Sequence, residues 1–310
     1  MAEEHTAKAR SSRGFFDRET QGVCVREEPS DKLLSITYGT VVGRMLLKVM
    51  AGRWPSSLWG HLMESALSRR RIKGFCARNG ITDESLVSDG YAPIDGYESF
   101  AAFFSRSRPV TCAGVPRVLY SPVDGYLTSH RIGEGLSVDI KGTIYALSEL
   151  LGEDGGHVVQ QGWQEAFCNG HCLAFRLSLT DYHHFHYPAT GRRKSFYEIA
   201  GELHSVRRVA SGKRPFSRNK RSVSLLELDG FGTVAMIEIG AMLVGRIEQD
   251  ELEANGTFVA GAHKGGFALG GSTVVLLMGD GVAIDPDIVQ AGAQGLETRV
   301  RAGMRIGSIT

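Results

Sequence analysis

Residues 267–278 read FALGGSTVVLLM, in which a glycine pair and a serine–threonine pair precede a run of apolar residues. The apolar run predicts a buried strand that starts near Ser272. The corner before it has two ordinary interpretations, a tight turn or a phosphate-binding loop. It lacks the lysine of a P-loop and does not match the G-x-S-x-G of hydrolases. In a third interpretation, the Gly271–Ser272 bond is itself reactive.

Short strand-like runs of the same kind recur from about Arg108 onward, separated by Gly, Asp and Asn. They are RVLYSP, GYLTSHRI, GLSVDIKG, CLAFRLSL and SVSLLELDGFGTVAMIEIGAMLVGRIEQ. Asp229–Gly230 in the last run predicts a hairpin. One short helix is expected at YALSELLG, and the basic, turn-rich stretch 211–222 is expected to be a surface loop. Residues 106–310 are therefore predicted to form an antiparallel, β-rich domain resembling a barrel or a sandwich.

Residues 1–105 have a different, helical character. Residues 1–30 are predicted to be a loosely ordered arm, and a three-to-four spacing of apolar residues begins near Lys32. Further helices are predicted at SSLWGHLMESALSRRRIKGF, TDESLVSDG and GYESFAAFFSRS. The predicted fold class is α+β, with an N-terminal helical layer followed by the β-rich domain.

Composition excludes several classes of protein. A hydrophobic content of 42% and a formal net charge of +1 argue against a disordered chain and against a general nucleic-acid binder. Five scattered cysteines favour free thiols in a reducing compartment over a disulfide framework. The start lacks the apolar core of a signal peptide, and no run reaches the roughly 18 apolar residues of a membrane span. We expect a cytoplasmic protein that is soluble or peripheral to a membrane.

Three histidines lie close together in the segment DYHHFHYPATG. On a strand His184 and His186 would share a face, whereas in a turn His183 and His186 would meet. No carboxylate or thiolate stands nearby at a spacing that suits a metal, and CNGHC lacks a second ligand pair, so no metal site is predicted. A surface histidine cluster and a group for proton transfer both remain open.

Asp124, in YSPVDGYL, would by itself be interpreted as a turn residue that caps its own backbone. Together with His186 and Ser272 it supplies the residue types of a catalytic triad. The order of the three along the chain is not diagnostic, because a triad requires only that the side chains converge in space.

Taken together, these segments resemble the phosphatidylserine decarboxylases, pyruvoyl-dependent proenzymes that cleave themselves, and above all their shorter bacterial type. The resemblance runs from FFDRETQGV to VRAGMRIGS, nearly the whole chain. Its motifs are YESFAAFFSR, SPVDG, IKGTIYALSELLG, DYHHFHYPATG, FSRNKR, IEIGAMLVGRI and FALGGSTVV.

The resemblance implies that the Gly271–Ser272 bond is the cleavage site. The Ser272 hydroxyl would attack the Gly271 carbonyl to give an ester, and β-elimination followed by loss of ammonia would leave a pyruvoyl group. The products would be a β subunit, residues 1–271, and an α subunit that starts at the former Ser272. By the same resemblance His186 is the base, Asp124 orients it, and His183 protonates the product or positions the substrate carboxylate.

The implied activity is that of a carboxy-lyase, which converts phosphatidylserine to phosphatidylethanolamine and CO₂ at a membrane surface. The pyruvoyl group would condense with the substrate amine and act as the electron sink. Basic and apolar residues of the N-terminal helices would bind anionic lipid, unless their apolar face packs on the β-rich domain instead. These residues are Lys48, Arg53, Leu58, Trp59, Leu62, Met63, Arg69, Arg70, Arg71 and Lys73. The oligomeric state stays open, with a homo-oligomer among the alternatives.

One stretch departs from the family pattern. Many relatives carry Lys-Gly-x-Glu-x-Gly before the cleavage motif, whereas AGAHKGGF places Ala260 at the position of the Lys and His263 at that of the Glu. A different substrate, such as a free amino acid like tryptophan, is therefore an alternative. A non-enzymatic alternative is an uncleaved β-barrel binding module, against which the presence of Asp124, His186 and Ser272 together argues.

Overall fold

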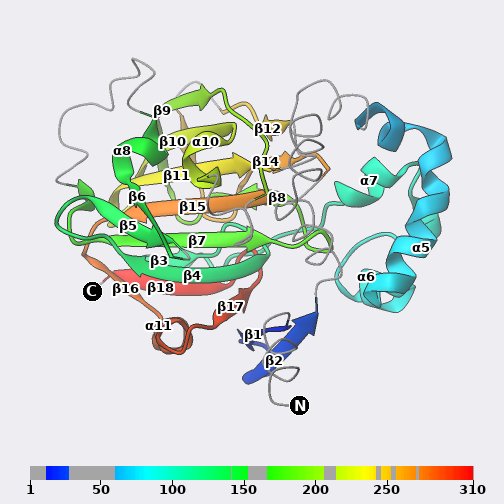
Figure 1. Ribbon diagram of the computed structural model, residues 1–310, viewed down its shortest axis with the longest axis horizontal. Coiled ribbons are helices and arrows are strands. Elements are labelled where there is room, and N and C mark those ends of the chain that lie inside the picture. Colours follow the sequence, from blue (N-terminus) through cyan, green and yellow to red (C-terminus); the bar gives the residue numbers. More distant parts are fainter. Residues whose placement is uncertain are drawn as a thin grey trace, which may run out of the picture.

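The computed structural model describes residues 12–27, 60–140, 142–152, 166–205, 214–241, 246–252, 256–269 and 272–309. It confirms the predicted α+β class: the short helices of the N-terminal region lie to one side of a set of mostly antiparallel sheets (Figure 1). The described helices of the N-terminal region all precede the first strand of the β-rich part, β3 (Val118–Tyr120).

The helical region consists of short pieces with recognisable caps: η1 (Ala66–Arg69), α5 (Arg70–Asn79), α6 (Asp83–Ser88), η2 (Ile94–Gly96) and α7 (Phe100–Phe104). Thr82 forms a capping box with Ser85 at the start of α6, and the Ser99 side chain caps α7. The helix expected over residues 56–75 is interrupted at Ser65, because the Ser68 hydroxyl donates to the Ser65 and Met63 carbonyls.

These helices pack against the β-rich part through an apolar cluster. Ile72, Cys76, Leu86 and Phe103 lie against Tyr182 and Ala302. At least part of the apolar surface of the helices is therefore internal to the protein.

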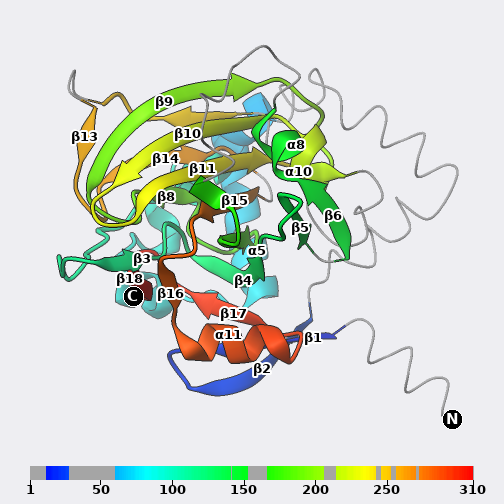
Figure 2. The ribbon, with the colours of Figure 1, turned by 90° about the vertical axis from the view of Figure 1, so that its left-hand side faces the viewer.

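The largest sheet has ten described strands and is open at both ends. In spatial order they are β13 (Thr257–Phe258), β9 (Gly191–Ile199), β10 (Arg221–Leu228), β11 (Gly232–Gly240), β15 (Ser272–Met278), β7 (His171–Leu177), β4 (Gly125–Arg131), β17 (Glu297–Val300), β1 (Ser12–Asp17) and β2 (Gly22–Glu27). All neighbours are antiparallel except β1 and β17. The sheet curves strongly without closing into a barrel (Figure 2).

Smaller elements cover both faces of this sheet. They are β12 (Ile247–Gln249), β14 (His263–Phe267) and β8 (His184–His186) in one sheet, β16 (Val282–Ile284) and β18 (Arg305–Ile309) with β3 in a second, β5 (Ser137–Ile140) and β6 (Thr143–Ala146) in a third, and the helices α8 (Leu147–Leu151), α10 (Pro215–Arg218) and α11 (Pro286–Ala293). Val274 and Leu276 belong to the apolar cluster on one face, and Val275 and Leu277 to that on the other. Burial on both faces explains why β15 is continuously apolar instead of alternating.

Two sequence expectations were wrong in part. Residues 12–27 are not a loose arm but the hairpin β1–β2, because Phe15 packs edge-on against Tyr126 and β1 pairs with β17. The basic stretch 211–222 is not simply a surface loop: it contains α10, and Arg221 is buried, where it donates to the carbonyls of Leu150 and Glu149 at the end of α8. The hairpin expected at Asp229–Gly230 is confirmed between β10 and β11.

A fully buried ion pair joins the large sheet to the small sheet that contains β8. Lys264 of β14 donates to Glu238 of β11 at 2.9 Å and to Gln249 of β12 at 2.8 Å, and both charged side chains are 0% exposed. Burial raises the pKa of Glu238 and lowers the pKa of Lys264. The hydrogen bonds of this ion pair are complete only when Lys264, Glu238 and Gln249 are all present, so the pair fixes the position of β14 against β11.

Breaking this pair is expected to destabilise the fold more than replacing it. In the Ser272→Ala chain, which removes the expected cleavage, Lys264→Met leaves Glu238 buried without its cation and should cost about 3–5 kcal/mol. Adding Glu238→Leu should recover most of that loss, since an apolar pair removes the desolvation penalty. Urea unfolding of the two variants and of Glu238→Leu alone measures the coupling. Losses that simply add would contradict this description.

Candidate active site

Four strand ends meet at one edge of the large sheet. β15 begins at Ser272, which pairs with Leu177 at the end of β7 and with Gly240 at the end of β11. β4, which begins at Gly125, pairs with the other side of β7. Asp124 immediately precedes β4, so antiparallel pairing brings Asp124 and Ser272 to the same edge, on strands separated only by β7.

Ser272 is completely buried, and its Oγ has no hydrogen-bond partner within the described residues. The Oγ1 of Thr273 is in the same state. The partner of Ser272 on β11 is Gly240, which has no side chain to fill the space beside the hydroxyl. An unpaired buried hydroxyl costs free energy, so its presence calls for an explanation such as a reactive role. Gly271, on the other side of the predicted cleavage site, lies outside the described residues.

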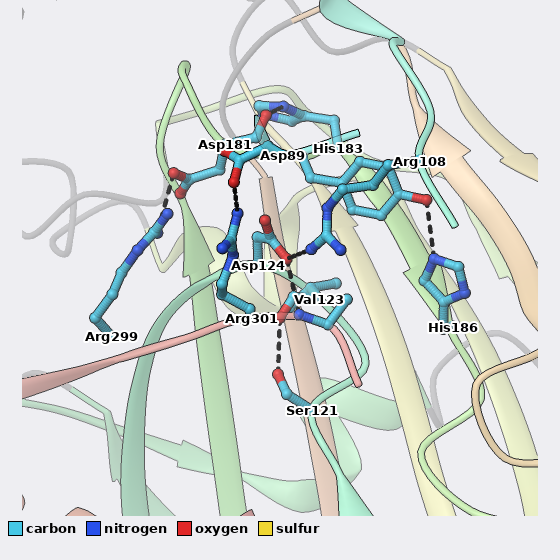
Figure 3. Close-up of polar contacts among 12 residues, drawn as sticks. Asp89, Arg108, Ser121, Val123, Asp124, Asp181, His183, His186, Arg299 and Arg301 are labelled. Atoms are coloured by element: carbon cyan, nitrogen blue, oxygen red, sulfur yellow. Dashed lines mark hydrogen bonds and ion pairs between the residues drawn. The ribbon is translucent and has the colours of Figure 1, made fainter. Parts of the chain in front are cut away.

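Asp124 is buried and bound by two donors. Its Oδ1 accepts from Arg108 Nη2 at 2.7 Å and from the Ala302 backbone N–H at 2.7 Å (Figure 3). Burial raises the pKa of Asp124, and the charge of Arg108 works against that rise. The carboxylate is thus held in place by a cation and a backbone amide.

His186 has a defined tautomer because one of its partners can only accept. Its Nδ1 lies 2.9 Å from the Gly261 carbonyl oxygen, so the neutral ring carries its proton there. Its Nε2 lies 3.0 Å from the Tyr182 hydroxyl and accepts from it (Figure 3). Burial lowers the pKa of His186 to about 4. A neutral imidazole with its lone pair on Nε2 has the form that a general base requires.

The predicted contact between Asp124 and His186 is not formed among the described side chains. Arg108 and Tyr182 link the two residues instead. Arg108 donates to Asp124 (Figure 3), its guanidinium carbon lies 5.0 Å from the centre of the Tyr182 ring, and Tyr182 is hydrogen-bonded to His186. The sequence analysis missed both mediators. Tyr182 directly precedes His183 in the histidine motif, but nothing in the sequence pattern relates Arg108 to that motif.

His183 is fully buried against Phe104 of α7, with the ring centres 4.0 Å apart. Its Nδ1 lies 2.8 Å from the Asp181 carbonyl oxygen and so carries the proton, while Nε2 has no hydrogen-bond partner in the described parts of the chain. Burial lowers the pKa of His183 to about 4. The Phe267 N–H donates to the His183 carbonyl and so ties this residue to β14, just before Ser272 in the chain.

Four arginines surround these groups. Arg108 pairs with Asp124, Arg299 with Asp181 at 3.0 Å, and Arg301 with Asp89 (Figure 3). Arg106 donates to the backbone carbonyls of Phe103 and Thr180, and no described carboxylate pairs with it. Such a concentration of guanidinium groups favours anionic ligands.

Neither a metal cluster nor a membrane span is found within the described ranges. These contain no group of three or more His, Cys, Asp or Glu side chains arranged to hold a metal ion. In the same ranges no helix combines the length and the apolar character needed to cross a bilayer. A group made from Ser272 itself would need no such ligands, and the residue paired with Ser272 on β11, Gly240, has no side chain.

One groove lies beside these residues and does not include them. It has a volume of about 980 Å³ and is lined by, among others, Tyr187, Leu228, Phe258, Ala262 and His263. Asp124, His183, His186 and Ser272 are absent from its lining. The buried residues Asp124, His183, His186 and Ser272 remain the candidates for the chemistry, because this groove contains none of them.

Comparison with known proteins gives a consistent result. Residues 97–308 match the family model described as phosphatidylserine decarboxylase. A phosphatidylserine decarboxylase proenzyme of Ruminiclostridium cellulolyticum is 35% identical over 303 residues, covering 95% of this chain and 97% of the relative. Proenzymes of the same name from Clostridium tetani and Clostridium perfringens are 35% identical over 301 residues and 33% over 304 residues. These two alignments cover 94% and 95% of this chain, and 97% and 99% of the relatives.

Proposed function

The chain belongs to the phosphatidylserine decarboxylase family, a family of carboxy-lyases, and from this premise we propose that it cleaves its own Gly271–Ser272 bond and then decarboxylates phosphatidylserine. The observation that carries the proposal is the state of Ser272: a fully buried hydroxyl that is hydrogen-bonded to no described residue, at the start of a strand paired on both sides. Cleavage would yield a β subunit of residues 1–271 and an α subunit of residues 272–310.

In the cleavage step Ser272 Oγ attacks the Gly271 carbonyl carbon, and the peptide C–N bond breaks as the ester bond forms. The hydroxyl proton goes to His186 Nε2, either through the Tyr182 hydroxyl or after that hydrogen bond opens. β-Elimination then removes the Ser272 Cα proton and breaks the Cβ–Oγ bond, which leaves the Gly271 carboxylate and a dehydroalanine. Water adds to the dehydroalanine, ammonia departs, and a pyruvoyl group remains.

In this proposal Asp124 acts on His186 at a distance. Its carboxylate fixes Arg108, and Arg108 lies over the ring of Tyr182, which in turn bonds His186. Asp124 is therefore a positioning residue in the uncleaved chain, and Tyr182 is the residue that touches the base.

In the decarboxylation step the pyruvoyl group supplies the electron-withdrawing carbonyl that takes up the electron pair left by CO₂. His183 is neutral near pH 7 and offers only an acceptor at Nε2. It is therefore suited to take the proton of the substrate ammonium group and to return it to the substrate carbon after CO₂ has left. The surrounding arginines suit a substrate that carries a phosphodiester and a carboxylate.

We further propose that the enzyme is cytoplasmic and binds an anionic membrane peripherally. Leu62 and Leu67 are 49% and 74% exposed, close to Arg69, Arg70 and Lys73. Exposed leucines among basic side chains favour the surface of anionic lipid. Lys48, Arg53, Leu58 and Trp59 of the predicted surface lie outside the described residues.

Ser272→Ala removes the attacking oxygen and is expected to leave a single full-length chain without decarboxylase activity. A denaturing gel of the purified protein is the measurement, with wild-type protein as the cleaved control. Two fragments from Ser272→Ala would refute the assigned bond. A single full-length band from the wild type would support the uncleaved binding module instead.

The two buried histidines are expected to separate the two steps. His186→Ala removes the base and should block cleavage. His183→Ala should still cleave but should lose at least about 100-fold in turnover, the usual contribution of a positioned proton donor and acceptor. Gel analysis and CO₂ release report on the two steps separately. Normal turnover by His183→Ala would exclude that residue from the mechanism.

Substrate class is tested by supplying cleaved wild-type protein with phosphatidylserine vesicles or with free tryptophan. We expect CO₂ release from the vesicles only, and flotation of the protein with anionic vesicles at low salt but not at high salt, because screening weakens attraction to the surface. Release from tryptophan alone would favour the amino acid decarboxylase. No vesicle binding at any salt concentration would refute the membrane proposal.

A further inference from the structure

A second group of ionisable side chains lies beside His186 and is not used by the proposed reaction. His184 Nδ1 lies 2.8 Å from His263 Nε2, and His263 Nδ1 lies 2.5 Å from Asp250 Oδ2. On the other side of the His184 ring, Nε2 lies 2.9 Å from the Ser105 carbonyl oxygen. The hydrogen-bonded chain therefore runs from Ser105 through two imidazoles to a carboxylate.

The number of hydrogens that these hydrogen bonds require determines the charge of the two imidazole rings. The Ser105 carbonyl accepts only, so His184 Nε2 must carry a hydrogen, and the Asp250 carboxylate requires one on His263 Nδ1. The contact between the two rings needs exactly one more hydrogen. Three hydrogens on four ring nitrogens are one more than two neutral imidazoles possess. With Asp250 ionised, a complete set of these hydrogen bonds therefore requires one positive charge on the two imidazoles.

This charge lies next to the base. The His263 ring meets the His186 ring edge to face, with the centres 5.2 Å apart. Tyr182 stacks on His184 with the ring centres 5.0 Å apart and on His186 with the centres 5.7 Å apart. His263 therefore contacts the base directly, and Tyr182 contacts both His184 and His186.

We propose that His184 and His263 share one proton against Asp250, and that this charge keeps the neighbouring His186 unprotonated and ready to act as the base. His263 is then a positioning residue for self-cleavage, at the position where many relatives carry Glu. The role of His263 in cleavage rests on the proposed function, whereas the number of hydrogens on the His184 and His263 rings does not.

Other charged groups also face these rings, and burial holds the pKa of both His184 and His186 below the ordinary value. Burial is the largest cause of the lowered pKa of His186, and the nearby His263, His184 and Arg108 lower it further, while the Gly261 carbonyl raises it. For His184, burial and His263 lower the pKa, while Ser105, Asp250 and Glu248 raise it. The two acidic groups thus face the shared proton, and the cations face His186.

The direct test is a pH titration by NMR of the full Ser272→Ala chain with isotope-labelled histidine. We compare it with the same chain carrying His263→Gln or His263→Glu. The wild-type residue contributes a positive charge, Gln none and Glu a negative charge, so the proton affinity of His186 should rise in that order. For His263→Gln the rise should be roughly threefold to tenfold, as expected for one partly screened charge about one ring away. In the same spectra the four ring nitrogens of His184 and His263 should together carry three hydrogens.

His61→Gln is the matched control. It replaces an exposed histidine that forms an ion pair with Glu64, and it should leave the proton affinity of His186 unchanged. An unchanged proton affinity of His186 in both His263 variants would overturn the proposal, and so would two hydrogens, in place of three, on the rings of His184 and His263.

The cleavage readout uses freshly translated chain with Ser272 intact. The pH below which cleavage slows should move upward in the order His, Gln, Glu at position 263. If cleavage slows equally at every pH, His263 is only structural. If no chain cleaves at any pH, the proposed function fails, while the NMR titration still decides the proton count.

Discussion

The pairing of β15 with β7 on one side and β11 on the other is the constraint on which the rest of the site depends. It fixes Ser272 at the first residue of a central strand, where the side chain is completely buried, and sets Gly240 opposite it. Apolar clusters on both faces of the strand hold it there. A hydroxyl held in this way meets little water, so in the proposed reaction an ester formed on it is protected from hydrolysis before elimination. The same dry surroundings strengthen every nearby charge.

Burial also determines what the two histidines can do. The Asp181 and Gly261 carbonyls hold the proton on Nδ1 of His183 and His186, and both rings have a pKa of about 4. Both are therefore neutral near pH 7, with the lone pair on Nε2. Asp124 does not touch either ring and acts through Arg108 and Tyr182. The described contacts form a series from Asp124 through Arg108 and Tyr182 to His186, and not a three-residue triad.

Much of the fold could be predicted from local sequence, because the signals were local. The apolar run after Ser272, the Asp229–Gly230 turn and the short helix within TDESLVSDG each depend on neighbouring residues, and the structure contains all of them. The hairpin β1–β2 was missed because its stability comes from β17, which lies far away in the chain. Arg221 was expected at the surface because the sequence cannot show that the carbonyls at the end of α8 would be buried around it. Arg108 was missed for the same reason, since its contact with Asp124 depends on how the helical region packs on the sheet.

The most direct test of the central claim is the intact mass of the purified wild-type protein. The account predicts two polypeptides, residues 1–271 and 272–310. The smaller one should be lighter, by the mass of one ammonia molecule, than the same fragment with a free amino-terminal serine. A single 310-residue polypeptide in material that releases CO₂ from phosphatidylserine would contradict it.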